Sequence, residues 1–156
     1  MASAPRMQPW QRDFVEQVGL LADTGLPRSM TRVLGWLVVC RPPEQSAEQL
    51  RTTLRLSAGA VSAATSLLVR EGIVRRQTVP GDRRLYYRVE PDGWYRLLRN
   101  RLELTTRARQ LAEVAMAAAG RQADERLAAM HDFYARGEAA FGALLDGRTP
   151  GRRSRR

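Results

Sequence analysis

The run from residue 46 to residue 89 constrains the fold more than any other part of the chain. It contains two helix-like stretches in which apolar residues recur at spacings of three and four. Ser46 precedes the first stretch and Ser57 the second, where a side-chain oxygen can accept a hydrogen bond from a free backbone N–H. Gly72 follows the second stretch and can adopt the left-handed conformation that ends a helix. The run therefore predicts two short helices, the second over about residues 58–71.

Two strand-like segments follow these helices. Residues 73–79 and 84–89 are rich in β-branched and aromatic residues, and the turn formers Pro80, Gly81 and Asp82 lie between them. Two helices followed by a hairpin are typical of a helix-turn-helix with a wing. We therefore predict an α+β fold that is mostly α: a winged helix-turn-helix with a two-stranded wing, flanked by N- and C-terminal dimerisation helices.

The polar face of the second helix consists of small side chains. Serine, alanine and glycine let a helix approach the major groove closely, although they offer few bidentate hydrogen bonds to base edges. Arginines next to this face and to the hairpin turn can reach phosphates and the minor groove. The residues that we expect at DNA are Ser46, Ser57, Ala58, Gly59, Ser62, Ala63, Ser66, Arg70, Arg75, Arg83 and Arg84. A small helical domain with a solvated serine-rich face would give the same helices, but it would not need an arginine-flanked hairpin.

The charge balance indicates a polyanionic partner. The chain has 156 residues, of which 26 are basic and all of these arginine, against 16 acidic ones, giving a formal net charge of +10. Double-stranded DNA fits this balance best, because arginine pairs well with phosphate and guanine. An anionic membrane surface fits less well, since no segment sets arginines along one face and large apolar groups along the other. We therefore expect a DNA partner and no membrane partner.

The sequence contains no signature of several other classes of protein. A single cysteine, Cys40, and a single histidine, His131, can form neither an internal disulfide nor a zinc site of the usual spacing. The sequence has no glycine-rich phosphate loop and no nucleophile elbow, so we expect no enzyme activity, no cofactor and no metal. No secretory segment is recognisable, and the longest apolar run, residues 33–40, is too short to span a bilayer. We therefore expect a cytoplasmic protein with Cys40 as a buried, inert thiol.

Both flanks of the run have helical apolar patterns. Residues 8–23 predict an amphipathic helix whose apolar face is Trp10, Phe14, Val18 and Leu21. A second helix is expected between Pro27 and the pair Pro42-Pro43. After the hairpin, a long helix from residue 91 to about 119 has leucines at intervals of seven: Leu97, Leu104 and Leu111. A last helix repeats this spacing with Leu127, Tyr134 and Phe141. The two C-terminal helices need a partner, either each other or a second copy of the chain.

These patterns divide the chain into four parts. We expect an N-terminal dimerisation helix (1–26), a winged helix-turn-helix domain (27–90), C-terminal dimerisation helices (91–146) and a disordered basic tail (147–156). The tail consists mainly of glycine, proline, serine and arginine, which cannot form an apolar core.

Several motifs of the central run occur together in a known family. They are Leu56-Ser57, Val61-Ser62, Gly72-Ile73-Val74-Arg75-Arg76 and the wing Gly81-Asp82-Arg83-Arg84-x-Tyr86-Tyr87. Together they resemble the MarR superfamily of bacterial winged-helix regulators. The wing, with Trp94 shortly after it, looks most like the GbsR-type branch.

The resemblance implies a homodimer in which two winged lobes straddle an operator. It also implies that the helix over residues 58–71 enters the major groove and that Arg84, spaced from Asp82 as in the family, enters the minor groove. The chain departs from the family at Ala63, where many relatives have an arginine. Recognition by the helix is therefore expected to be weak, and the wing and DNA shape should contribute more.

Three tryptophans are candidates for an effector pocket: Trp10, Trp36 and Trp94. Large aromatic side chains on apolar stripes are also common core residues. Our interpretation is a dimeric transcriptional repressor that binds operator DNA and is released by a small-molecule effector. A sensor whose primary event is ligand binding, a nonspecific basic DNA-binding protein and a winged-helix protein-interaction module remain open alternatives.

Overall fold

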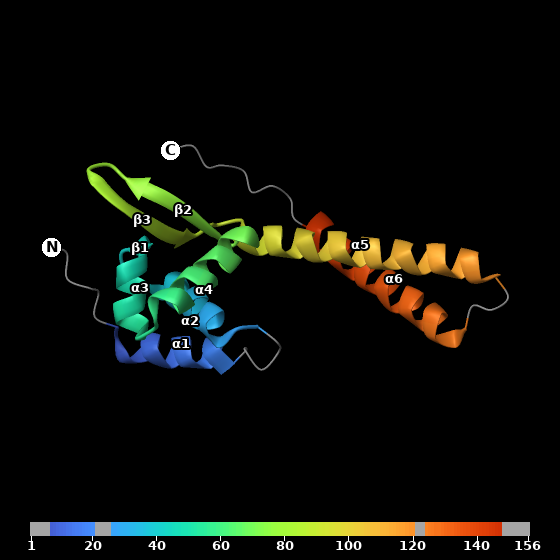
Figure 1. The fold of residues 1–156 in the computed structure, drawn as a ribbon, viewed down its shortest axis with the longest axis horizontal. Coiled ribbons are helices and arrows are strands. Elements are labelled where there is room, and N and C mark those ends of the chain that lie inside the picture. The colour runs from blue at the N-terminus through green and yellow to red at the C-terminus, as the bar shows by residue number, and fades with distance from the viewer. Residues whose placement is uncertain (1–6, 21–25, 121–123, 148–156) are drawn as a thin grey trace. The chain divides into compact units, whose positions relative to one another are not determined.

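The computed structural model describes residues 7–20, 26–120 and 124–147. The chain forms two compact units, the N-terminal unit Met1–Gly93 and the C-terminal unit Trp94–Arg156 (Figure 1). The expected end of the first helix at residues 21–23 and the tail from residue 148 onward lie outside the described residues. None of the described helices is both long enough and apolar enough to span a membrane.

The N-terminal unit combines helices with one small sheet. Its elements are α1 (Pro9–Leu20), α2 (Arg28–Val39), β1 (Gln45–Ser46), α3 (Ala47–Leu54), α4 (Ala58–Arg70), β2 (Val74–Val79) and β3 (Asp82–Val89). This order confirms the predicted α+β winged helix-turn-helix fold. The predicted helix over residues 58–71 ends one residue earlier, with Glu71 as its C-cap.

The two helices of the helix-turn-helix begin at the predicted serines. Ser46 forms a capping box with Gln49, and the Ser57 Oγ accepts a hydrogen bond from the backbone N–H of Ala60 at 3.1 Å. Between the helices, Arg55 turns the chain with a φ of 53°. Gly72 ends α4 with a φ of 74°, a conformation that glycine adopts without steric cost.

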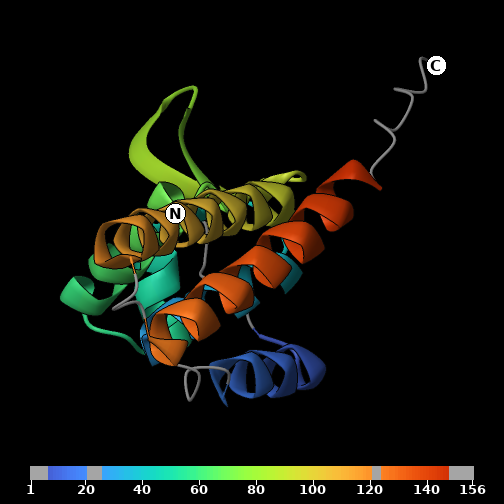
Figure 2. The ribbon, with the colours of Figure 1, turned by 90° about the vertical axis from the view of Figure 1, so that its right-hand side faces the viewer.

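The wing belongs to a sheet with three strands, one more than predicted. β2 and β3 form an antiparallel hairpin that extends away from the helices of its unit in both ribbon views (Figures 1 and 2). The strand order is β1-β3-β2, with Gln45 of β1 opposite Tyr87 of β3. The additional strand, β1, could not be predicted from the sequence, because a strand of two residues has no periodic pattern.

The core of the N-terminal unit lies between α2, α3, α4 and the sheet. Trp36 is 1% exposed, and its indole N–H donates to the buried amide oxygen of Gln45 at 3.2 Å. The Gln45 amide in turn donates to the carbonyl of Pro42 at 2.8 Å, so β1 is fixed to α2. Cys40 is buried as expected, and burial raises the pKa of its thiol to about 12.

The first helix packs on α2 with a different face from the predicted one. Gln11, Val15 and Gly19 are the buried residues of α1, whereas Trp10 is 59% exposed and Phe14 is also exposed. The two backbones approach closely, because a Cβ on Gly35 of α2 would lie 3.2 Å from the side chain of Val18. A bulky tryptophan does not fit such an approach, so the aromatic stripe is turned outward.

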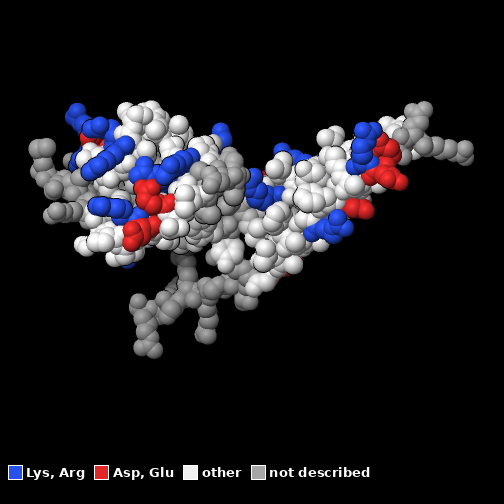
Figure 3. Space-filling model, turned by 90° about the horizontal axis from the view of Figure 1, so that it is seen from below, with Lys and Arg blue, Asp and Glu red and all other residues white. Residues whose placement is uncertain are grey.

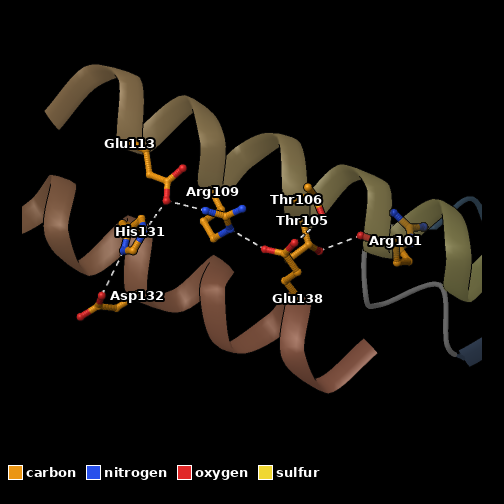
Figure 4. Close-up of polar contacts among 8 residues, drawn as sticks. All are labelled: Arg101, Thr105, Thr106, Arg109, Glu113, His131, Asp132 and Glu138. Carbon is orange, nitrogen blue, oxygen red and sulfur yellow. Dashed lines mark hydrogen bonds and ion pairs between the residues drawn. The ribbon is translucent and has the colours of Figure 1, made fainter. Parts of the chain in front are cut away.

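The C-terminal unit is a pair of helices, α5 (Gly93–Ala119) and α6 (Glu125–Asp146), joined by polar contacts (Figure 4). Glu138 of α6 forms an ion pair with Arg109 and accepts a hydrogen bond from the Thr106 hydroxyl at 3.0 Å. One turn further along α5, Glu113 contacts the His131 imidazole at 3.4 Å. Both helices therefore contribute charged groups to their shared face.

Two of the three leucines at intervals of seven, Leu104 and Leu111, do not form this contact. Leu104 and Leu111 are 57% and 65% exposed, while Thr105 and Ala112, the residues that follow them, are buried. The Cβ position of Gly137 on α6 would lie 3.1 Å from Thr105, so small residues set the approach of the helices. Leu104 and Leu111 are therefore directed away from α6.

Candidate nucleic-acid interface

The outer face of α4 consists of small, exposed side chains. The members of this face are Ala58, Gly59, Ser62, Ala63 and Ser66, with the exposed Arg70 at the C-terminal end of the helix. A Cβ added to Gly59 would meet no atom within 4 Å, so the surface is open at that point. The Ser57 hydroxyl accepts the capping bond and can still donate its own proton outward. Such a surface can approach another molecule closely.

Ser46 has a different environment from the other serines predicted at DNA. It is 2% exposed, its Oγ accepts from the backbone N–H of Gln49 at 3.2 Å, and its own N–H donates to the Gln49 side chain at 2.8 Å. The side chain of Ser46 therefore starts α3 and is not available at the surface.

Arg84 is held by the other residues on its face of the wing. Its Nε donates to both carboxylate oxygens of Asp82, at 3.0 and 2.9 Å, and its guanidinium lies 5.6 Å from the ring centre of Tyr86. The Tyr86 hydroxyl donates to the same carboxylate at 2.8 Å. The hydrogen bonds from Arg84 and Tyr86 hold the pKa of Asp82 well below its ordinary value, so the ion pair persists at neutral pH. The exposed Arg84 is thus oriented in advance.

Arg83 and Arg84 are consecutive residues of β3 and project from opposite faces of the hairpin. Arg83 is exposed and has no ion pair with any carboxylate that the structure describes, and the same holds for Arg70 and Arg75. Other parts of the N-terminal unit differ. Arg28 and Arg32 share the carboxylate of Glu16, and Figure 3 shows a face on which acidic side chains lie among the basic ones. Four arginines at α4 and the wing, Arg70, Arg75, Arg76 and Arg83, thus have no carboxylate partner among the described residues. Arg12, Arg41 and Arg55, elsewhere in the unit, have none either.

A groove with a volume of about 260 Å³ lies between the C-terminal half of α4 and the sheet. Its lining residues are Thr65, Ser66, Val69, Arg70, Arg76 and Tyr87. A second groove, of about 190 Å³, lies between α3 and α4 and contains Arg51, which is bound by Glu48 at 2.7 Å. The first groove is therefore positively charged, whereas the charge of Arg51 in the second is balanced.

Comparison with known proteins identifies the family. The MarR family profile matches residues 24–85, and the profile described as MmpR5-like MarR family transcriptional regulator matches residues 92–147. The HTH-type transcriptional regulator MmpR5 of Mycobacterium tuberculosis (strain ATCC 25618 / H37Rv) is 37% identical over 132 residues, covering 82% of this chain and 80% of that protein. The chain belongs to the MarR family. A solved structure titled as a crystal structure of a transcriptional regulator has 35% identity and a TM-score of 0.76, covering 88% of this chain and 97% of that one.

Membership of the MarR family makes this chain a DNA-binding transcriptional regulator, as the winged helix-turn-helix indicated. The described residues contain no group of three His, Cys, Asp or Glu side chains that could hold a metal ion. The exposed face of α4 and the arginines of the wing form the candidate DNA-binding site.

The three tryptophans do not share an environment in this MarR-family chain. Trp36 belongs to the core, whereas Trp10 on α1 and Trp94 on α5 are exposed, the latter by 48%. Neither of the two grooves beside α4 is lined by a tryptophan.

Sequence reasoning missed Arg76, Tyr86 and Tyr87 at this surface. Tyr86 lies two residues beyond Arg84 and shares its face of β3, and Arg76 is directly opposite Tyr87 in the β2–β3 ladder. The alternation of side chains along the two strands is the signal that could have identified all three.

Proposed function

We propose that the chain is a homodimeric repressor that binds operator DNA, with α4 in the major groove and the wing in the adjacent minor groove. In this proposal the repressor acts in the cytoplasm and a small-molecule effector releases it from DNA. The main support is that the exposed, small-sided face of α4 lies in one unit with four exposed arginines of α4 and the wing, Arg70, Arg75, Arg76 and Arg83, which have no carboxylate partner among the described residues. DNA phosphates attract such arginines whatever the base sequence is, and contacts with the base edges in the grooves then determine the specificity.

The recognition helix is assigned a mainly positioning role. Ser57 and Ser62 donate to phosphates, while Ala58, Gly59 and Ser66 lie against the bases at close approach. The small side chains offer few bidentate hydrogen bonds, and Ala63 provides none where many relatives have an arginine. The sequence preference of the operator should therefore depend strongly on the shape of the DNA.

The wing supplies the groove-reading arginine. Arg84 enters the minor groove, where a narrow groove concentrates negative potential, and Arg83 and Arg75 bind phosphates on either side. Asp82 and Tyr86 support this role because they fix the guanidinium before DNA arrives, which lowers the entropy lost on binding.

Dimerisation is assigned to the apolar stripes that a single chain leaves exposed. On α5 these residues are Trp94, Leu104, Leu111 and Val114, and on α1 they are Trp10 and Phe14. Their exposure fits a second copy of the chain as partner. We keep the division into an N-terminal dimerisation helix (1–26), a DNA-binding domain (27–90), C-terminal dimerisation helices (91–146) and a tail (147–156). The exposed Trp10 and Trp94 are our candidates for effector contacts, and the GbsR-type likeness of the wing stays a prediction.

A competition band shift tests this function. The probe is the DNA upstream of the chain's own coding region, and the competitor is unrelated duplex of the same length. A specific regulator should keep the probe shifted in the presence of excess competitor. Equal competition by unrelated DNA would instead indicate a nonspecific DNA-binding protein, and the absence of any shift would favour a protein-interaction module.

A further inference from the structure

We propose that the groove between α4 and the wing holds one phosphate group of the DNA backbone, bound by Arg70 and Arg76 with the hydroxyls of Ser66 and Tyr87. This inference rests on the proposed function, since it assumes that α4 and the wing bind one duplex. With α4 in the major groove and the hairpin in the adjacent minor groove, the sugar-phosphate strand that separates the two grooves has to pass between them. The groove lies between these two elements, where that strand would pass.

The charge of the groove matches a phosphodiester. Two of its six lining residues are arginines and none is acidic. Neither Arg70 nor Arg76 forms an ion pair with a carboxylate in the described part of the chain. In the neighbouring groove, by contrast, Arg51 donates to Glu48 at 2.9 and 2.7 Å. Phosphate oxygens are charged and accept hydrogen bonds only, so they fit a groove that offers cationic donors without a competing carboxylate.

The lining side chains come from both elements that the phosphate would join. Arg70 is in the last turn of α4, whereas Arg76 belongs to β2 and faces Tyr87 across the ladder. The Thr65 hydroxyl already donates to the carbonyl of Val61 at 2.8 Å. Among the described residues, the hydroxyls of Ser66 and Tyr87 have no hydrogen-bond partner and can donate to a phosphate oxygen.

The bound phosphate would position α4 and the wing on the duplex. A phosphate held from both sides would fix the depth of α4 in the major groove and the angle of the wing toward the minor groove. Because every phosphodiester is alike, this contact should raise affinity for any duplex and carry no sequence information.

The test measures the affinity of the full-length chain for fluorescein-labelled upstream DNA and for a scrambled duplex over a series of salt concentrations. Arg76→Ala should raise the Kd about 10-fold for both duplexes and lower the slope of log K against log salt by about one. Tyr87→Phe, which removes only the hydroxyl, should weaken binding less and leave the slope unchanged. The matched control is Arg107→Ala, which removes an arginine of α5 that is 80% exposed and should change neither quantity.

Three results would overturn the inference while leaving the proposed function intact, provided that the wild-type chain binds the upstream DNA. One is an Arg76→Ala protein, folded by circular dichroism, that binds like the Arg107→Ala control. Another is a loss confined to the upstream DNA, which would make Arg76 a base-reading residue. The third combines two observations: inorganic phosphate at constant ionic strength stabilises the wild-type chain against heat, and Arg76→Ala abolishes this stabilisation without changing DNA binding. That result would indicate a site for a free anion. A wild-type chain that binds neither duplex would overturn the proposed function itself.

Discussion

Replacing Arg84 by alanine should remove the minor-groove contact of the wing. A guanidinium has five N–H donors, and the Nε and one Nη2 donor of Arg84 bind Asp82, which leaves about three donors for thymine and adenine acceptors and phosphates. The side chain is prepositioned, so little conformational freedom is lost when it binds. We expect Arg84→Ala to raise the Kd for the upstream DNA about 5- to 150-fold, the range of a single groove-reading arginine.

Fluorescence anisotropy at one salt concentration measures this change, and the chain contains a matched control. Arg126 is bound by Asp124 in the same spacing, with its Nε donating to the carboxylate at 2.8 Å, but it is located in the C-terminal unit. Arg126→Ala removes the same charge and should change the Kd less than about twofold.

Arg84→Ala also leaves the Asp82 carboxylate unpaired near phosphates, so a second variant separates the two causes. Asp82→Asn in the Arg84→Ala background removes that repulsion. If the double variant regained wild-type affinity, the loss would come from the freed carboxylate and the minor-groove assignment would be wrong. Wild-type affinity of a folded Arg84→Ala protein would refute the reasoning directly.

Three further predictions concern the helix surface, the dimer and the thiol. Ser62→Glu puts a negative charge among the DNA phosphates and should abolish the band shift, whereas Ser62→Ala should retain most of it. A Ser62→Glu protein that still shifts the DNA at moderate salt would contradict the docking of α4 in the major groove. Light scattering should give twice the 17.6 kDa chain mass for the wild type and 17.6 kDa for Leu111→Arg. A wild-type monomer at micromolar concentration would rule out the dimer. Because burial raises the pKa of Cys40 to about 12, a thiol reagent at pH 8 should modify only the unfolded chain, and rapid modification of the folded chain would show that the thiol is accessible.

The elements that sequence alone predicted well are those specified by local chemistry. Ser46, Ser57 and Gly72 determine where helices begin and end through hydrogen bonds and backbone conformation a few residues away, and the structure confirms all three. The hairpin was predictable for the same reason, since Pro80 and Gly81 define its turn.

Which face of each helix is buried was less predictable, because an apolar stripe in the sequence does not determine which surface will pack against it. Trp10 and Phe14 resemble a core face, yet the close approach at Gly35 places Val15 inward and leaves the aromatics exposed. On α5 the leucines suggested a seam, while the contact with α6 depends on Arg109 and Glu138, polar residues without a recognisable repeat. Ser46 was predicted at DNA as an N-cap serine, but only the pairing of β1 with β3 reveals that it is buried.

A hydroxyl-radical footprint on the upstream DNA tests the central claim that paired winged lobes read one operator. The account predicts a symmetric pattern of protection with half-sites about 10 bp apart from centre to centre, including protected sugars in the minor groove where the wings insert. Even protection along the whole duplex, or a single protected patch without symmetry, would contradict it.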